Sequence, residues 1–120
     1  MIIEAIRQHV LPDTEIPKPD AQGRFLVKGW GRRRDESALI YKIPNHNNPS
    51  KPYEKGITVS DFESSYRQLK TSGELTRQWF NEHVPDCAYE GTCNFTTVGG
   101  IFELLGYAEY LGNGVYSFKN

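Results

Sequence analysis

The sequence concentrates its clearest binding chemistry in one short basic and aromatic stretch. That stretch contains Lys28, Trp30, Arg32, Arg33 and Arg34, flanked by Phe25 and Tyr41. Aromatic rings stack on bases while cations meet phosphates, so this pairing is typical of single-stranded nucleic acid binding. Asp35 and Glu36 follow the arginines directly and neutralise half of the cluster. The alternative interpretation is therefore a charged hairpin tip that is only solvated.

A second group of residues has the chemistry of a metal site. His83, Cys87 and Cys93 follow the spacing H-x3-C-x5-C, and His46 or His9 would have to supply a fourth ligand. Structural zinc sites usually contain closely paired cysteines, and this spacing fits no standard finger. The alternatives are buried thiols, or a chance proximity of Cys87 to Cys93. We predict no metal and no other cofactor.

Enzymatic motifs are missing from the sequence. It contains no phosphate loop, no dinucleotide-binding glycine fingerprint and no nucleophile elbow. Pro19 and Asp20 invite comparison with nucleases, but no acidic-x-Lys element follows to complete a site for a catalytic metal. We therefore predict a protein that is not an enzyme.

The elements that position these residues follow from the periodicity of the first half. Apolar residues from Ile2 to Val10 give a short N-terminal helix one buried side. Residues 11–23 contain three prolines and predict an extended connector. Residues 24–43 predict a β-hairpin whose charged tip spans 31–37. Residues 44–56 are rich in Pro and Asn and predict a surface loop.

The second half shows helical patterns. Ser60 and Glu63 have the spacing of a capping box, which predicts a helix that ends near Gly73. Thr76 is the predicted cap of a second helix, and residues 86–94 are predicted to form a loop after it. Apolar residues at i, i+3, i+4 and i+7 predict a third helix, which ends at a glycine. The apolar residues are Val98, Ile101, Phe102 and Leu105, the glycine is Gly106, and a hairpin turn follows at Gly112, Asn113 and Gly114.

This succession of helix, helix, loop, helix and hairpin resembles the winged helix-turn-helix superfamily over the C-terminal half. The run IFELLGYAEYLGNGVYSF carries the resemblance most specifically. The resemblance implies that the third helix presents base-reading side chains. Those positions here are Thr96, Thr97, Gly99, Gly100 and Glu103, and none is basic. We expect Thr96 and Thr97 to be secondary nucleic-acid contacts, and Gly99, Gly100 and Glu103 to form an interaction surface.

Two adjacent glycines inside a helix need a compensating interaction, because each costs about 1 kcal/mol relative to alanine. One explanation for Gly99 and Gly100 is a close crossing with another helix. A second is the approach of a partner protein or a phosphate backbone to a bare surface. A third is a helix that begins later than predicted.

Length and charge set the wider expectations. The 120 residues predict one compact α+β domain. We expect an N-terminal helix and β-hairpin, followed by a three-helix winged-helix-like part with a C-terminal β-hairpin. The two possible sub-units are residues 1–57 and 58–120. Residues 1–58 carry ten Lys or Arg against seven Asp or Glu, whereas residues 59–120 carry four against eight. No segment has the pattern of a membrane span or signal peptide, so we expect a cytoplasmic protein with no membrane partner. Two functions remain open: nucleic-acid binding through the basic hairpin, or a protein-interaction module or homodimer.

Overall fold

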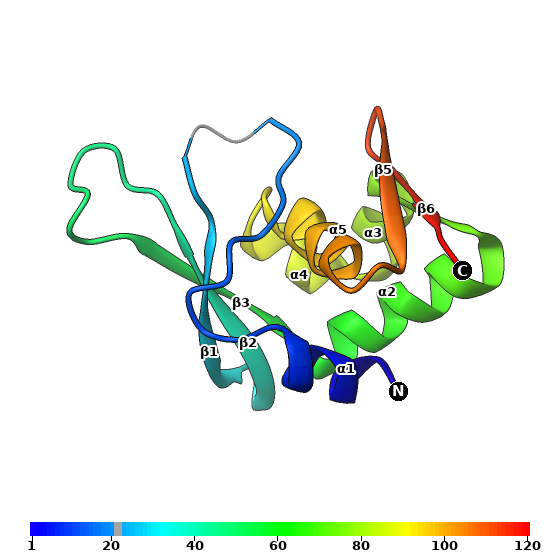
Figure 1. The fold of residues 1–120 in the computed structure, drawn as a ribbon, viewed down its shortest axis with the longest axis horizontal. Coiled ribbons are helices and arrows are strands. Elements are labelled where there is room, and N and C mark those ends of the chain that lie inside the picture. The colour runs from blue at the N-terminus through cyan, green and yellow to red at the C-terminus, as the bar shows by residue number, and fades with distance from the viewer. Residues whose placement is uncertain (21–22) are drawn as a thin grey trace.

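The computed structural model describes residues 1–20 and 23–120 as a mixed α/β fold, with five helices and two antiparallel sheets in these ranges. The first sheet has the order β1 (Leu26–Arg33), β2 (Glu36–Ile43) and β3 (Tyr53–Thr58). The second has the order β4 (Glu74–Thr76), β6 (Val115–Phe118) and β5 (Ala108–Gly112). The helices are α1 (Ile2–His9), α2 (Val59–Ser72), α3 (Arg77–His83), α4 (Pro85–Glu90) and α5 (Asn94–Leu104). α5 lies between the two sheets (Figure 1).

The predicted hairpin of residues 24–43 is present, but its turn is tighter than expected. β1 and β2 remain paired up to Arg33 and Glu36, so the turn consists only of Arg34 and Asp35, both with positive φ. Such two-residue turns match the twist of the strands they join. The predicted loop of residues 44–56 is wrong from Tyr53 onward, because β3 pairs with β2 there. The first residues of β3 are exposed, so they show no apolar alternation.

Helix α2 begins earlier than predicted. The Oγ1 atom of Thr58 accepts a hydrogen bond from the amide of Asp61, and the Asp61 carboxylate accepts one from the amide of Thr58. These two residues form the capping box, so the prediction of Ser60 and Glu63 is wrong. The predicted end at Gly73 is confirmed, with a left-handed φ of 88°. Within the two described ranges, no helix is both long enough and apolar enough to cross a membrane.

The second sheet and its helices follow the predicted order with two additions. Thr76 caps α3 as predicted, because its hydroxyl accepts from the amide of Trp79. The predicted loop of residues 86–94 is wrong at both ends, because the short helix α4 runs from Pro85 to Glu90 and α5 begins at Asn94. Strand β4 has only three residues and pairs with β6. The C-terminal hairpin is confirmed, and Asn113 lies in its turn with positive φ.

Buried apolar side chains from both halves form one core around α5. Gly99 faces the ring of Tyr116 on β6, and Gly100 faces the backbone of Pro17, so a Cβ atom at either position would overlap its neighbour. The close approach that we considered is therefore present, but the neighbours are a strand and the N-terminal segment rather than a helix. Both glycines are buried, so neither lies on the exposed surface where we expected it.

Candidate functional site

The basic hairpin uses several of its candidate binding residues inside the chain. The Nζ atom of Lys28 lies 2.8 Å from a carboxylate oxygen of Glu54 on β3. The guanidinium of Arg7 on α1 lies over the Trp30 ring, 4.2 Å from its centroid. Lys28 is therefore held in an ion pair, and the Arg7 cation covers one face of the Trp30 ring.

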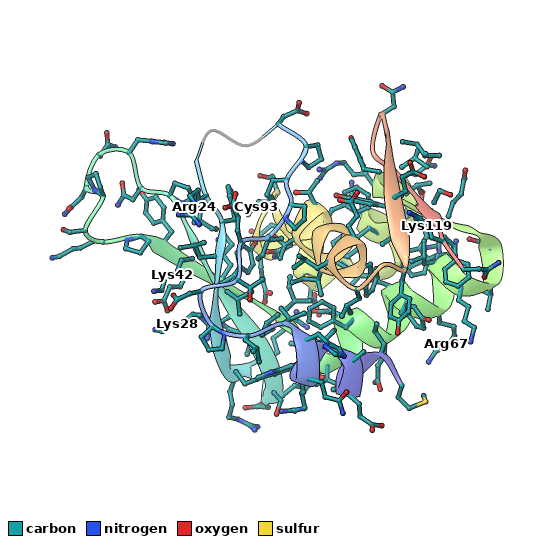
Figure 2. All side chains as sticks on the ribbon, in the orientation of Figure 1. Arg24, Lys28, Lys42, Arg67, Cys93 and Lys119 are labelled. Atoms are coloured by element: carbon teal, nitrogen blue, oxygen red, sulfur yellow. The ribbon has the colours of Figure 1, made fainter. Side chains whose placement is uncertain are left out.

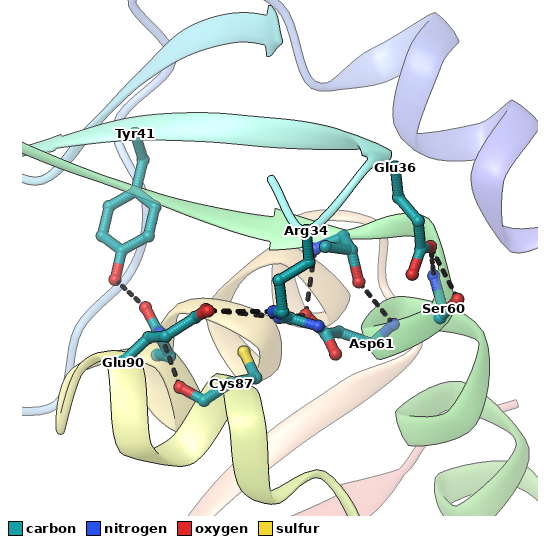
Figure 3. A network of polar contacts seen from close by, with 9 residues as sticks. Arg34, Glu36, Tyr41, Ser60, Asp61, Cys87 and Glu90 are labelled. Atoms are coloured by element: carbon teal, nitrogen blue, oxygen red, sulfur yellow. Dashed lines mark hydrogen bonds and ion pairs between the residues drawn. The ribbon is translucent and has the colours of Figure 1, made fainter. Parts of the chain in front are cut away.

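Arg34 connects the hairpin turn to two helices (Figure 3). Its Nη2 atom donates to Asp61 of α2 at 2.7 Å, and its Nε atom donates to Glu90 of α4 at 2.9 Å. The side chain of Asp61 is only 6% exposed, so this end of the network is nearly dry. The hydrogen bond to Glu90, followed by the one to Asp61, raises the pKa of Arg34. Arg34 thus holds three elements together.

Arg32 and Arg33 are the two hairpin arginines that form no ion pair among the described residues. Each guanidinium donates to a main-chain carbonyl close to the turn. The labelled cations lie in more than one place. Figure 2 shows Lys28 toward the first sheet, whereas Arg67 and Lys119 lie toward the opposite end of the molecule.

The residues expected on the reading face of α5 have different surroundings. Thr97 is buried, and its Oγ1 atom accepts a hydrogen bond from Lys18 Nζ at 3.0 Å. Glu103 accepts from the backbone amide of Tyr110 at 3.1 Å, which fastens α5 to β5. Thr96 is half-buried and lines a hollow. Thr97 therefore lies in the core, while Thr96 keeps a position beside open space.

The three residues of the metal hypothesis do not come together. Cys87 is buried, and burial raises the pKa of its thiol. The Sγ atom of Cys93 lies 3.1 Å from the hydroxyl of Tyr41, and His83 bonds through Nδ1 to the carbonyl of Trp79. Both cysteines are free thiols. In the parts of the chain that the structure covers, no three histidine, cysteine or acidic side chains converge as metal ligands do.

A hollow of about 580 Å³ lies between α3, α4 and the start of α5, and we call it the aromatic hollow. Its lining includes Phe80, Phe95, Ala88 and Tyr89, with Arg77 at one edge. Phe80 and Phe95 are buried and pack edge to face, with ring centroids 5.6 Å apart. Tyr89, by contrast, is 93% exposed. Tyrosine is enriched at protein interfaces, so Tyr89 beside this hollow is a candidate contact for a partner.

Arg77 also borders a second hollow of about 430 Å³, which we call the cationic hollow. Its lining includes Lys18, Asp20, Phe25, Arg77, Thr96 and Tyr110. The Arg77 guanidinium donates to the carbonyl of Thr92 at 3.2 Å and lies 4.8 Å from the centroid of the Phe95 ring. Arg77 and Thr92 line both hollows, so they form the ridge between them.

Lys18 is the half-buried cation of the cationic hollow. Its Nζ atom donates to the carbonyl of Cys93 at 2.9 Å and to Thr97, and it lies 4.5 Å from the centroid of the Phe25 ring. Burial lowers the pKa of Lys18 to about 8, while Cys93 acts in the opposite direction and the positive charge of Arg77 in the same one. The Lys18 side chain therefore links the N-terminal segment to α5. The positive charge of its ammonium group is poorly compensated.

No family model, no curated protein and no solved structure matches this chain. We did not predict Lys18 or Arg77 as site residues from the sequence. Lys18 and Arg77 are isolated cations that only the fold brings to one hollow. One available signal was the position of Lys18 between Pro17 and Pro19, where the following proline restricts the Lys18 backbone to extended conformations.

Proposed function

We propose that this chain is a small, non-enzymatic protein-interaction module of winged-helix type, which binds a segment of a partner protein over the aromatic hollow. The exposed ring of Tyr89 beside that hollow is the observation that carries the proposal. The winged-helix assignment is supported by the order α2, β4, α3, α5, β5, β6, with β6 central in the second sheet. In this arrangement α4 is an additional helix, and it supplies Tyr89.

The chemistry of the aromatic hollow suggests what the partner presents. Pro85, Ala88 and Tyr89 offer accessible apolar surface above the buried rings of Phe80 and Phe95, which favours an aliphatic or aromatic anchor side chain. Arg77 forms no ion pair among the described residues and stands at the edge of the hollow, which favours a carboxylate next to that anchor. We therefore expect a partner segment with an apolar anchor and one neighbouring acidic group.

Insertion of α5 into a DNA groove is less well supported than binding of a partner protein. Pro17 and Tyr116 cover α5 at its two glycines. Residues 59–120, which contain α5, carry four basic against eight acidic residues. A phosphate backbone needs clustered positive charge, so this half would repel it.

Replacing Tyr89 with serine tests the interaction surface. Peptides selected from a random displayed library on the wild-type protein are expected to contain an apolar residue next to Asp or Glu. Because a central aromatic anchor is worth about 2 kcal/mol, Tyr89→Ser should weaken those peptides roughly thirtyfold by calorimetry. The matched control is Tyr53→Ser, which removes another exposed tyrosine on the first sheet.

The outcome of the selection is decisive in either direction. Equal binding by wild type and Tyr89→Ser would reject the aromatic hollow as the interface. Sedimentation velocity of the wild-type protein alone distinguishes a second copy of the chain from another partner. A dimer that Tyr89→Ser dissociates would make the partner a second copy, and a monomer that selects no peptide would contradict the proposal.

Nucleic-acid binding through the hairpin is the second candidate, because Arg32 and Arg33 form no ion pair in the described parts of the chain. With two such cations, the slope of log K against log salt for a short duplex should be no steeper than about −1.8. The double variant Arg32→Ala/Arg33→Ala should abolish that slope, while Arg34→Ala should leave it unchanged if folded. Filter binding over a salt series measures both. No binding at low salt would reject this candidate.

A further inference from the structure

Three hydrogen-bond donors with unused capacity line the cationic hollow. The ammonium of Lys18 has three N–H groups, of which Cys93 and Thr97 accept two. Arg77 has five N–H groups and gives one to Thr92. The hydroxyl of Tyr110 accepts from the amide of Gly114, so its own proton remains to be donated.

These donors come from three parts of the chain that are distant in sequence. Lys18 lies in the N-terminal segment, Arg77 begins α3 and Tyr110 lies in β5. Their convergence on one hollow brings two positive charges near each other, and the charge of Arg77 contributes to the lowered pKa of Lys18. Within residues 1–20 and 23–120, neither cation pairs with a carboxylate. Asp20 lines the same hollow but accepts no hydrogen bond from either.

We propose that the cationic hollow is a binding site for a phosphate group, held between Lys18, Arg77 and Tyr110. A dianion would balance both cations, and its terminal oxygens would accept from donors that approach on different sides. A planar carboxylate offers two oxygens in one plane and a single charge, so it satisfies this arrangement less well. The site goes beyond the proposed function: Arg77 borders both hollows, but phosphate binding can be observed without a partner protein.

The size and lining of the hollow indicate that the phosphate is carried by an organic group. The volume of about 430 Å³ exceeds what a phosphate group fills, and Phe25 and Tyr110 add aromatic surface. An aromatic phosphomonoester would place its ring against these side chains. We therefore expect phenyl phosphate to bind more tightly than inorganic phosphate.

The test uses nuclear magnetic resonance titration of the full chain with phenyl phosphate, inorganic phosphate and acetate at constant ionic strength. Phosphates should shift the backbone amide resonances around Arg77, Thr96 and Tyr110, and acetate should bind at least about tenfold more weakly. The affinity for phenyl phosphate should fall as the pH rises from about 7 to about 9, because Lys18 loses its proton while the phosphomonoester, whose second pKa is about 6, stays dianionic. Cys93, Arg77, Asp20 and Tyr110 are the other titratable or charged groups that face Lys18, and their effects enter the same profile.

Two substitutions with opposite expected signs make the test specific. Arg77→Gln alters an exposed side chain and should weaken phosphate binding by about tenfold or more. Asp20→Asn removes the one carboxylate of the hollow and should strengthen binding. Equal affinities for acetate and phosphate, or unchanged affinity in both variants, would overturn the site. Tyr89→Ser should leave phosphate binding intact, so a failure of the proposed protein interface remains distinguishable from a failure of this site.

Discussion

Replacing Asp61 with alanine is expected to lower the free energy of unfolding by about 3 kcal/mol. The carboxylate has two tasks at once, because it caps α2 through the amide of Thr58 and pairs with Arg34. Loss of the cap alone costs about 1 kcal/mol. Removing the nearly buried carboxylate from the Arg34 guanidinium, which then keeps only Glu90 as a carboxylate acceptor among the described residues, adds about 2 kcal/mol. Urea unfolding followed by circular dichroism measures the difference.

Glu90→Ala is the matched control for this prediction, because Glu90 is the other carboxylate on the same guanidinium. Its side chain is 38% exposed, so its ion pair should contribute less than about 1 kcal/mol. Asp61→Asn should fall between the two variants, since an amide oxygen still accepts the capping hydrogen bond. Similar small losses in Asp61→Ala and Glu90→Ala would show that the Arg34 network does not hold the hairpin to the helices.

Gly99→Ala is expected to lower the free energy of unfolding by about 2 kcal/mol, although alanine is the better helix former by about 1 kcal/mol. The new methyl group would overlap the ring of Tyr116, which is fully buried between Phe95 and Tyr110. Because Tyr116 packs against rings on both sides, it has little room to move. Thermal and urea unfolding measure the change.

Two further variants separate this steric effect from helix propensity. Tyr116→Leu creates space beside residue 99, so adding Gly99→Ala to it should cost less than adding Gly99→Ala to the wild type. Glu63→Ala changes an exposed position of α2 and should have an effect within about 0.5 kcal/mol. A Gly99→Ala protein that is more stable than the wild type would show that the helix and β6 are not in close contact.

Elements with a strong local signal could be predicted from the sequence. The turn at Asn113, the cap at Thr76 and the stop at Gly73 each depend on a few neighbouring residues, and all three are present. Local spacing did not reveal which capping box starts α2, because Ser60 with Glu63 was predicted and Thr58 with Asp61 is present. Tertiary contacts decide it, because Arg34 binds Asp61 from a distant turn.

The candidate site could not be predicted because its parts are distant in sequence. The basic hairpin stood out as a local cluster, yet Glu54 and Glu90 reach it from other elements and neutralise two of its cations. Lys18, Arg77 and Tyr110 stood out nowhere, since no window of sequence contains all three. A pattern within one segment identifies charges, whereas the pairing of those charges depends on topology.

The adjacent glycines of α5 also have an evolutionary consequence. Tyr116 excludes a side chain at residue 99, and the backbone of Pro17 excludes one at residue 100. Mutations at these codons should therefore be removed by selection even where the surface residues of the two hollows diverge. Homologues that have lost most other identity should keep the pair Gly99–Gly100 together with an aromatic residue at position 116, and this spacing is a signature by which distant members of the lineage can be found.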